Sequence, residues 1–493
     1  MDSPILFGLF EHIPLNHTAE RAVYLQLADS MLELIKQGTL RAGQKLPGSR
    51  DIARILHINR ITVQKAIEEL VIQGWLESVI GRGTFVSTHM KDYEPVKPDK
   101  HLSPPAHQKA GFTIQPIHYL HSVPDIPFPE LHLDDGYPDP GLAPLKELYR
   151  AYRNQLTRSG LYNKFGCYGN PAGTSWYRQT MSDYLNTTRG LHTTAQNILS
   201  VRGTLMGINL VCNALIEPGD IVVAGVPGYS RMEQNIRHAG AQHIGITVDE
   251  HGLVTDELKT ICQQHRIRMV YVTPHHHYPT TVSLRLDRRM ELLRLANEYG
   301  FIILEDDYDF DFHYKHRPLL PLASADQHGM VIYCGSFSKS FSPAFRMGYL
   351  VAAENVIEHL SKVRVMQDRQ GDHILDNAVA DIVHDGTITR YLRRTLPVYE
   401  RRRNLFCHLL QQELKDRVLF NVPEGGMSVW TVFDKRIDLH ELAKKAYQKG
   451  LLLSDGDLHG HRPHHNNGIR IGFASSTEEQ LTRSVHILKT LIK

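Results

Sequence analysis

The sequence predicts two folded units. One is a small N-terminal unit of three helices and a β-hairpin; the other is a large C-terminal α/β unit with a mostly parallel sheet and a small C-terminal α+β subdomain. A chain of 493 residues is longer than one hydrophobic core usually serves. Residues 88–118 are rich in proline and poor in large aliphatic side chains, which is typical of an extended linker. Beyond them, short β-rich runs alternate with amphipathic helical patterns, the sign of βαβ units. We therefore expect an N-terminal extension (1–22), a helical unit (23–87), the linker, and an α/β unit (119–493).

The composition restricts the class of protein. Apolar residues make up 42% and charged residues 22%, the proportions of an ordinary soluble globular chain. The five cysteines are scattered, which argues against a disulfide framework and favours a reducing cytoplasm. No apolar run approaches the ~18 residues that span a bilayer, and the first residues lack a secretory signal, so we expect no membrane partner. The net charge of +2 argues against a nucleic-acid binder that is basic throughout.

The small unit is predicted from helical periodicity and turn signals. Apolar residues at helical spacing indicate helices at 23–37 and from residue 60 onward. A further helix is expected to begin after Ser49, which would act as its N-cap. A glycine-rich turn at 80–83, between two short β-rich runs, indicates a hairpin. The second and third helices, joined by the turn 57–59, form a helix-turn-helix.

Basic residues gather on this helix-turn-helix although residues 1–90 are neutral overall. Arg60, Thr62 and Lys65 lie off the apolar stripe of the third helix, where they suit base edges and phosphates in a major groove. Arg82 at the hairpin tip suits an adjacent minor groove. The alternative is a protein-docking module whose basic face is merely solvated. Between residues 41 and 66 only Asp51 is acidic, and the basic residues are Arg41, Lys45, Arg50, Arg54, Arg60 and Lys65.

Four motifs in this unit resemble the winged helix-turn-helix of the GntR regulators. They are LPGSRDIA at 46–53, NRITV at 59–63, GWLE at 74–77 and GRGTFV at 81–86. The resemblance implies that the partner is a double-stranded DNA operator. It also implies which residues contact the DNA: Ser49 and Arg50 at the start of the second helix, Arg60, Thr62 and Lys65 on the recognition helix, and Arg82 and Gly83 in the wing.

In the large unit, strands are expected at 198–201, 221–225, 269–273, 301–305, 331–334 and 349–352. Parallel sheets bind ligands just beyond the carboxyl ends of their strands. The last but one of these strands leads through small residues to Lys339, which could form an imine with an aldehyde cofactor. Ser336 and Arg346 nearby suit a phosphate. Most lysines lie on the surface, however, so this motif alone is weak.

Other strand ends strengthen the case for a cofactor. Asp306 and Tyr308 follow the strand at 301–305, where a buried carboxylate would keep a pyridine nitrogen protonated, unless it only caps a turn. Gly203 and Thr204 open a helix whose first N–H groups form an anion site. Tyr229 could stack on a flat cofactor, or pack in the core. Near the end of the chain, Arg470 lies in a β-alternating run that does not require it, and its fork suits a carboxylate.

These elements, in this order, resemble fold-type I aminotransferases, and with the GntR-like head they resemble the MocR subfamily of GntR regulators. The resemblance implies pyridoxal 5'-phosphate (PLP) as the cofactor, a small amine or amino acid as the effector, and a head-to-tail homodimer. It implies that Lys339 is the catalytic lysine joined to PLP as an imine. It assigns the other roles as follows: Asp306 to the pyridine nitrogen, Tyr308 to the ring oxygen, Tyr229 to stacking, Gly203, Thr204, Ser336 and Arg346 to the phosphate, and Arg470 and Arg231 to the effector carboxylate.

The expected function is a transcription regulator that senses an amine, an amino acid or PLP itself through Lys339. The alternative is a working aminotransferase with a DNA-binding head, and a weaker one is a binding module without a cofactor. Two departures from the subfamily affect the cofactor region: Leu205 and Met206 stand where it has two glutamines, and Thr281 replaces a glycine. The first 20 residues have no counterpart in the resemblance.

Histidine is unusually abundant, with 30 residues. Adjacent side chains of an extended chain point to opposite faces, so residues 275–277 cannot readily bind one metal ion together. One of the three is expected to line the cofactor pocket. A second group, at positions 459, 461, 464 and 465, is expected to be solvated surface. We therefore expect no metal site.

Overall fold

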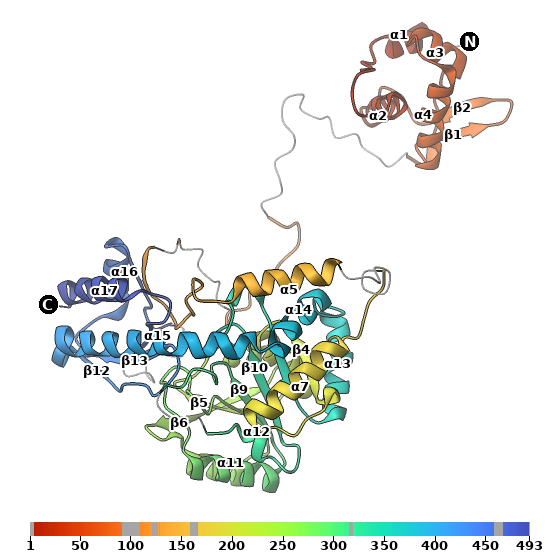
Figure 1. Cartoon of the computed structure of the whole chain (residues 1–493). Coiled ribbons are helices and arrows are strands. Elements are labelled where there is room, and N and C mark those ends of the chain that lie inside the picture. The colour runs from red at the N-terminus through yellow and green to blue at the C-terminus, as the bar shows by residue number, and fades with distance from the viewer. Residues whose placement is uncertain are drawn as a thin grey trace. The chain divides into compact units, whose positions relative to one another are not determined.

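The computed structural model describes residues 4–90, 109–120, 127, 129–157, 166–314, 319–457 and 467–492. The chain forms two compact units, Met1–Pro116 and Ile117–Lys493, which are described separately (Figure 1). Within the described ranges, no helix combines the length and apolar character needed to cross a membrane.

The small unit is a helical bundle with a wing. Its helices are α1 (Pro4–Glu11), α2 (Val23–Lys36), α3 (Ser49–Ile55) and α4 (Arg60–Ile72), followed by the antiparallel hairpin of β1 (Leu76–Val79) and β2 (Gly83–Val86) and by the short η1 (Thr88–Met90). The predicted helix-turn-helix and hairpin are confirmed within a residue or so at each end. The core joins apolar residues of all four helices and both strands.

Two details of the small unit differ from the sequence expectations. Ser49 is the first residue of α3 rather than its N-cap; Gly48 occupies the cap without a side-chain hydrogen bond. The Ser49 hydroxyl instead accepts a 3.3 Å hydrogen bond from Arg60 Nε at the start of α4. The residues expected to be a separate extension also belong to this fold, because Phe10 of α1 is fully buried in its core.

The large unit is built on an eight-stranded sheet. Its order is β4-β11-β10-β9-β8-β5-β6-β7, and the pairs from β10 to β6 are parallel. The six predicted strands are confirmed. The strands are β4 (Ile198–Val201), β5 (Ile221–Val226), β6 (Gln242–Asp249), β7 (Gly252–Leu253), β8 (Ile267–Val272), β9 (Ile302–Asp307), β10 (Val331–Ser336) and β11 (Gly348–Val351).

Alternating side chains of these strands pack against helices on both faces. On one face, Ala224 and Tyr271 share a core with α8 (Thr204–Leu215), α9 (Ser230–His238) and α13 (Glu354–Gln367). On the other, Val223 and Val270 pack with α10 (Thr255–Gln264) and α11 (Leu286–Tyr299). A third core lies among α5 (Leu145–Thr157), α7 (Ser175–Arg189) and α14 (His373–His384). The sheet is therefore covered on both sides, and its strand ends remain for ligands.

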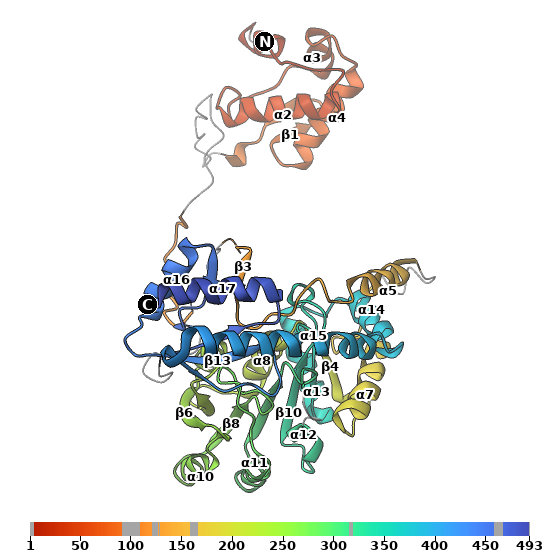
Figure 2. The ribbon, with the colours of Figure 1, turned by 60° about the vertical axis from the view of Figure 1, so that its left-hand side comes forward.

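The expected small α+β subdomain is also present. The long helix α15 (Thr387–Leu409) leads to an antiparallel sheet in the order β12-β13-β15. A parallel pair, β14 with β3, ties the subdomain to the beginning of the unit. Figure 2 shows α15, α16 and α17 beside these strands. The elements of the subdomain are β3 (Leu131–Leu133), η4 (Leu410–Leu414), η5 (Lys415–Arg417), β12 (Val418–Phe420), β13 (Ser428–Phe433), α16 (Leu439–Gln448), β14 (Leu451–Leu453), β15 (Gly468–Gly472) and α17 (Glu478–Leu491). The remaining short helices of the large unit are η2 (Ala195–Asn197), α12 (Leu322–Ala325) and η3 (Pro343–Phe345).

Candidate functional site

Asp306 lies near the carboxyl end of β9 and is 3% exposed. Its Oδ2 accepts a 2.8 Å hydrogen bond from the Tyr271 hydroxyl on the neighbouring strand β8. Its Oδ1 is buried and has no hydrogen-bond partner among the described residues. Burial raises the pKa of Asp306 to about 7. A buried carboxylate with a vacant acceptor oxygen is suited to a cationic N–H donor from a ligand.

Lys339 follows β10, the strand beside β9. Its Nζ donates a hydrogen bond to the carbonyl of Gly136 and lies 5.3 Å from the centroid of the Tyr137 ring. Burial lowers the pKa of Lys339, and the charge of Asp135 is the strongest opposing influence. A lowered pKa increases the fraction of the lysine amine that is unprotonated and therefore nucleophilic. Segment 135–137 was not among the predicted site residues.

The residues predicted to hold a phosphate come together at the start of α8. Gly203 is the N-cap of α8, with φ +77°, and Thr204 is the first helical residue. The Arg346 guanidinium donates a 3.1 Å hydrogen bond to the carbonyl of Arg202 and lies so close to Gly203 that a Cβ there would be 2.7 Å from Nη2. Ser336 Oγ accepts a 3.0 Å hydrogen bond from the backbone N–H of Ser338. A helix start with an adjacent guanidinium forms an anion-binding site.

Aromatic rings border the space near Asp306. Tyr229 is the residue before α9, and its ring meets that of Tyr278 edge-on at 5.1 Å between centroids. A cavity of about 610 Å³ lies beside Tyr229, with Tyr271 and His277 in its wall. The Tyr308 hydroxyl donates a 2.9 Å hydrogen bond to the carbonyl of His276. His277 lines this cavity, but Asp306 and Lys339 do not, so the expectation that one histidine of 275–277 lines the cofactor pocket stays a prediction.

The two arginines predicted to bind an effector carboxylate lie in different surroundings. Arg470 in β15 is 1% exposed, and its Nε is 3.5 Å from Asp135 Oδ1. Its guanidinium carbon lies 5.2 Å from the centroid of the Tyr278 ring and 5.8 Å from that of Tyr308. Arg231 belongs to α9 and donates a 2.9 Å hydrogen bond to Gln234 of the same helix. Only Arg470 therefore shares contacts with segment 135–137.

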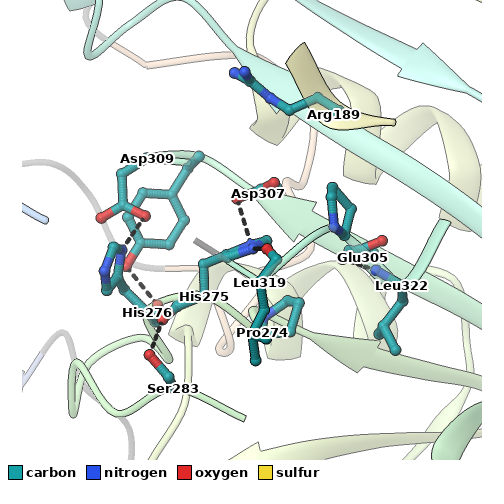
Figure 3. Close-up of polar contacts among 12 residues, drawn as sticks. Arg189, Pro274, His275, His276, Ser283, Glu305, Asp307, Asp309, Leu319 and Leu322 are labelled. Carbon is teal, nitrogen blue, oxygen red and sulfur yellow. Dashed lines mark hydrogen bonds and ion pairs between the residues drawn. The ribbon is translucent and has the colours of Figure 1, made fainter. Parts of the chain in front are cut away.

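The adjacent histidines bind separate partners. His275 Nδ1 lies 3.1 Å from Asp307 Oδ1, and His276 Nδ1 lies 2.8 Å from Asp309 Oδ1, as Figure 3 shows. His277 Nε2 lies 2.9 Å from the carbonyl of Pro227.

Burial alone would raise the pKa values of Asp307 and Asp309, but the histidine facing each carboxylate helps to hold them below the ordinary value. His275 and His276 therefore pair with carboxylates at and just after the end of β9. The second histidine group falls outside the described residues.

Thr281, which stands where the resembled family has glycine, adopts a left-handed conformation with φ +63°. This conformation is easy for glycine and rare for a β-branched residue. Its N–H donates a 2.7 Å hydrogen bond to the carbonyl of His277, which closes the turn behind the pocket wall. The departure changes the residue but keeps the turn.

Tyr271, Asp135 and Tyr278 were not predicted from the sequence. Tyr271 sits at an alternating position of a predicted strand and faces the same side as Asp306, so sheet register could have suggested it. Asp135 meets Arg470 across 335 positions, and no local motif marks that contact.

On the small unit, Arg60 Nε and Ser49 Oγ join the starts of α4 and α3. Asn59 caps α4 by accepting a hydrogen bond from the N–H of Ile61. Lys65 Nζ lies 6.0 Å from the centroid of the Tyr24 ring. At the wing, a Cβ on Gly83 would meet Lys45 Cε at 2.9 Å, so the glycine permits a close approach. Exposed side chains suited to DNA are Arg50, Arg60, Lys65 and Arg82, with Thr62 half-buried.

Comparison with known families matches both units. The model of bacterial regulatory proteins of the gntR family matches residues 23–86, and that of aminotransferase class I and II matches residues 137–488. The chain is 27% identical to the uncharacterized HTH-type transcriptional regulator YdfD of Bacillus subtilis, over 95% of this chain and 96% of that protein. It is 24% identical to the probable rhizopine catabolism regulatory protein MocR of Rhizobium meliloti, over 97% and 95% of the two chains.

Solved aminotransferase structures resemble the large unit. A Pyrococcus horikoshii kynurenine aminotransferase in complex with PMP superposes with a TM-score of 0.67 and 25% identity, over 74% of this chain and 91% of that chain. The α-aminoadipate aminotransferase LysN of Thermus thermophilus, complexed with N-(5'-phosphopyridoxyl)-L-leucine, superposes with a TM-score of 0.67 and 23% identity, over 73% and 92%. This second likeness shows the fold alone.

Proposed function

Because the chain belongs to the aminotransferase class I and II family and carries a gntR-type DNA-binding unit, we propose that it regulates transcription through a large unit that binds PLP and an amine. The regulatory role is that of its relatives, one of which is named an HTH-type transcriptional regulator and another a probable catabolism regulatory protein. The combination of the two units in one chain supports a protein whose DNA binding responds to a small molecule.

The observation that carries the PLP proposal is the vacant Asp306 Oδ1. The pyridinium N–H of PLP would donate a hydrogen bond to that oxygen, which has no partner among the described residues. Gly203, Thr204, Ser336 and Arg346 would hold the phosphate, Tyr229 would stack on the ring, and Tyr308 would orient the ring oxygen. When bound, PLP supplies an aldehyde that reacts reversibly with primary amines.

The chain's own residues would then convert amine binding into a change at the large unit. Lys339 would hold the cofactor until an amine takes its place, and its free Nζ would then donate to the Gly136 carbonyl and lie beside the Tyr137 ring. The aminotransferase fold suggests a dimer, and two copies of the DNA-binding unit would contact two half-sites of one operator. In this scheme the effector changes the affinity of the two DNA-binding units for the operator.

The test is the absorption spectrum of the purified full-length chain after addition of PLP. We expect a visible or near-ultraviolet cofactor band that sodium borohydride fixes to the protein, and that Lys339→Ala abolishes. Lys362→Ala removes an exposed lysine that is ion-paired to Glu358 on α13, and should leave the band unchanged. A band that persists in Lys339→Ala contradicts the proposal.

The same preparation separates a regulator from an enzyme. Operator retardation that changes on addition of an amine, with no keto acid formed over many turnovers, supports the regulator. Sustained transfer of the amino group between an amino acid and a keto acid would support the aminotransferase instead.

A further inference from the structure

Asp135 places a negative charge beside Lys339 and Arg470. Its side chain is 32% exposed, whereas Arg470 is 1% exposed. The backbone carbonyl of Asp135 accepts a 3.3 Å hydrogen bond from Arg470 Nε, so the two residues are held side by side. The neighbouring Asp134 accepts 2.8 Å hydrogen bonds from the N–H groups of Gly136 and Tyr137. Asp134 thereby fixes the turn that carries Asp135.

The ion pair between Asp135 and Arg470 is incomplete. The 3.5 Å between Asp135 Oδ1 and Arg470 Nε exceeds a normal hydrogen bond, and Oδ1 has no hydrogen-bond partner in the described part of the chain. Tyr278 donates a hydrogen bond to the same carboxyl group. Burial raises the pKa of Asp135, and the charges of Arg470 and Lys339 oppose that rise. A carboxylate in such a place gains from a further cationic donor.

We infer that Asp135 determines effector specificity, and that the pocket selects primary amines without an α-carboxylate over the corresponding amino acids. Arg470 already faces one carboxylate, and an α-carboxylate placed on it would lie against Asp135, with like charges in contact. An ammonium group in the same place would instead form an ion pair with the Asp135 carboxylate. This inference rests on the proposed PLP site and names the chemical class that the site takes.

The experiment uses the full-length chain loaded with PLP and three matched pairs of probes: cadaverine with lysine, putrescine with ornithine, and tyramine with tyrosine. Each pair differs by one carboxylate. The midpoint of the change in the cofactor band gives the apparent Kd. We expect each amine to bind the native chain at least about tenfold more tightly than its amino acid. In Asp135→Asn, which keeps the shape and removes the charge, this preference should disappear or reverse.

Two further variants make the outcome decisive. Glu130→Gln removes an exposed carboxylate from the same segment, paired with Arg483, and should keep the native preference. Arg470→Gln in the Asp135→Asn background should abolish any gain for amino acids. The inference is overturned if the native chain prefers the amino acids, if Asp135→Asn keeps the preference for amines, or if no probe changes a cofactor band that is present. Absence of the band in the native chain would instead contradict the proposed function.

Discussion

The Tyr271 hydroxyl donates a 2.8 Å hydrogen bond to Asp306 Oδ2 and leaves Oδ1 facing away from it with no partner among the described residues. The two residues stand on adjacent parallel strands, β8 and β9. Burial raises the pKa of Asp306 to about 7, and the hydrogen bond from Tyr271 opposes that rise. Tyr271 therefore favours the ionised form of Asp306, the form that would pair with a pyridinium.

Tyr271→Phe should weaken PLP binding, because Asp306 loses the donor that favours its charged form. A hydrogen bond to a charged group contributes about 1.5–3 kcal/mol, which corresponds to roughly 10–150-fold in Kd. Titration of the cofactor band at pH 7 and pH 9 measures this, and the loss should be smaller at pH 9, where Asp306 ionises without help.

Tyr333→Phe is the matched control. Its hydroxyl donates a 2.7 Å hydrogen bond to Asp307 Oδ2, the carboxylate that faces His275 rather than the pocket. We expect this variant to lose stability but to bind PLP as the native chain does. Equal loss of PLP affinity in both variants would show that Tyr271 acts only through packing.

Asp306→Asn should change how the stability of the cofactor-free chain depends on pH. The pKa of Asp306 rises from 3.8 to about 7 on folding, so the folded state holds the proton more firmly. Ionisation therefore costs stability progressively as the pH rises from about 4 to about 7, and the cost is constant above that. The variant avoids this cost, up to about 4 kcal/mol.

Calorimetric unfolding of the large unit at pH 5, 6, 7 and 8 measures this difference. The stability of the variant relative to the native chain should increase up to about pH 7 and then level off. Glu305, whose pKa burial raises to about 8, acts in the same direction in both proteins and cancels in the difference. A stability difference between the variant and the native chain that does not depend on pH would show that Asp306 does not bind the proton in the folded state.

The parts of the site that sequence could predict are those in which a motif and a strand end coincide. Lys339 and Asp306 follow strands that a continuous apolar run marks, so both could be located without long-range information. The strand β6, second from the edge of the sheet, was missed because its apolar residues Ile244, Ile246 and Val248 alternate with small or polar ones and form no continuous apolar run; of its residues only Ile246 is buried.

Contacts between distant segments could not be predicted. Alternation of the adjacent histidines predicted only that they would not bind one metal ion together. Asp307 and Asp309 are the partners of His275 and His276 because β9 ends beside the turn after β8. The burial of Phe10 depends on how the chain from α1 returns to the core, which local periodicity does not specify.

Phe10→Ala should destabilise the small unit, because the side chain is fully buried among residues of the helix-turn-helix core. Removal of a buried phenylalanine costs about 3–5 kcal/mol. Hydrogen exchange of backbone amides in α2 and α4, followed by mass spectrometry, should show faster exchange there and unchanged exchange in the large unit. Ile72→Ala, whose side chain is 81% exposed at the end of α4, should exchange as the native chain does. Unchanged protection of the backbone amides in Phe10→Ala would show that residues 4–11 do not contribute to the stability of the small unit.

The DNA face gives a prediction that separates base contacts from phosphate contacts. An operator selected from random duplexes provides the probe, and retardation at several salt concentrations gives Kd and its salt dependence. Arg60→Ala, at the start of the recognition helix, should cost about 1–3 kcal/mol of binding and relax the preferred sequence. Arg82→Ala in the wing should weaken binding to all sequences and reduce the salt slope by about 1 if Arg82 contacts phosphate.

The double variant Arg60→Ala with Arg82→Ala should lose specific retardation of the operator. Arg21→Ala, which removes an exposed arginine paired with Asp29 outside the helix-turn-helix, should bind as the native chain does. Undiminished binding by the double variant would overturn the assignment of this face.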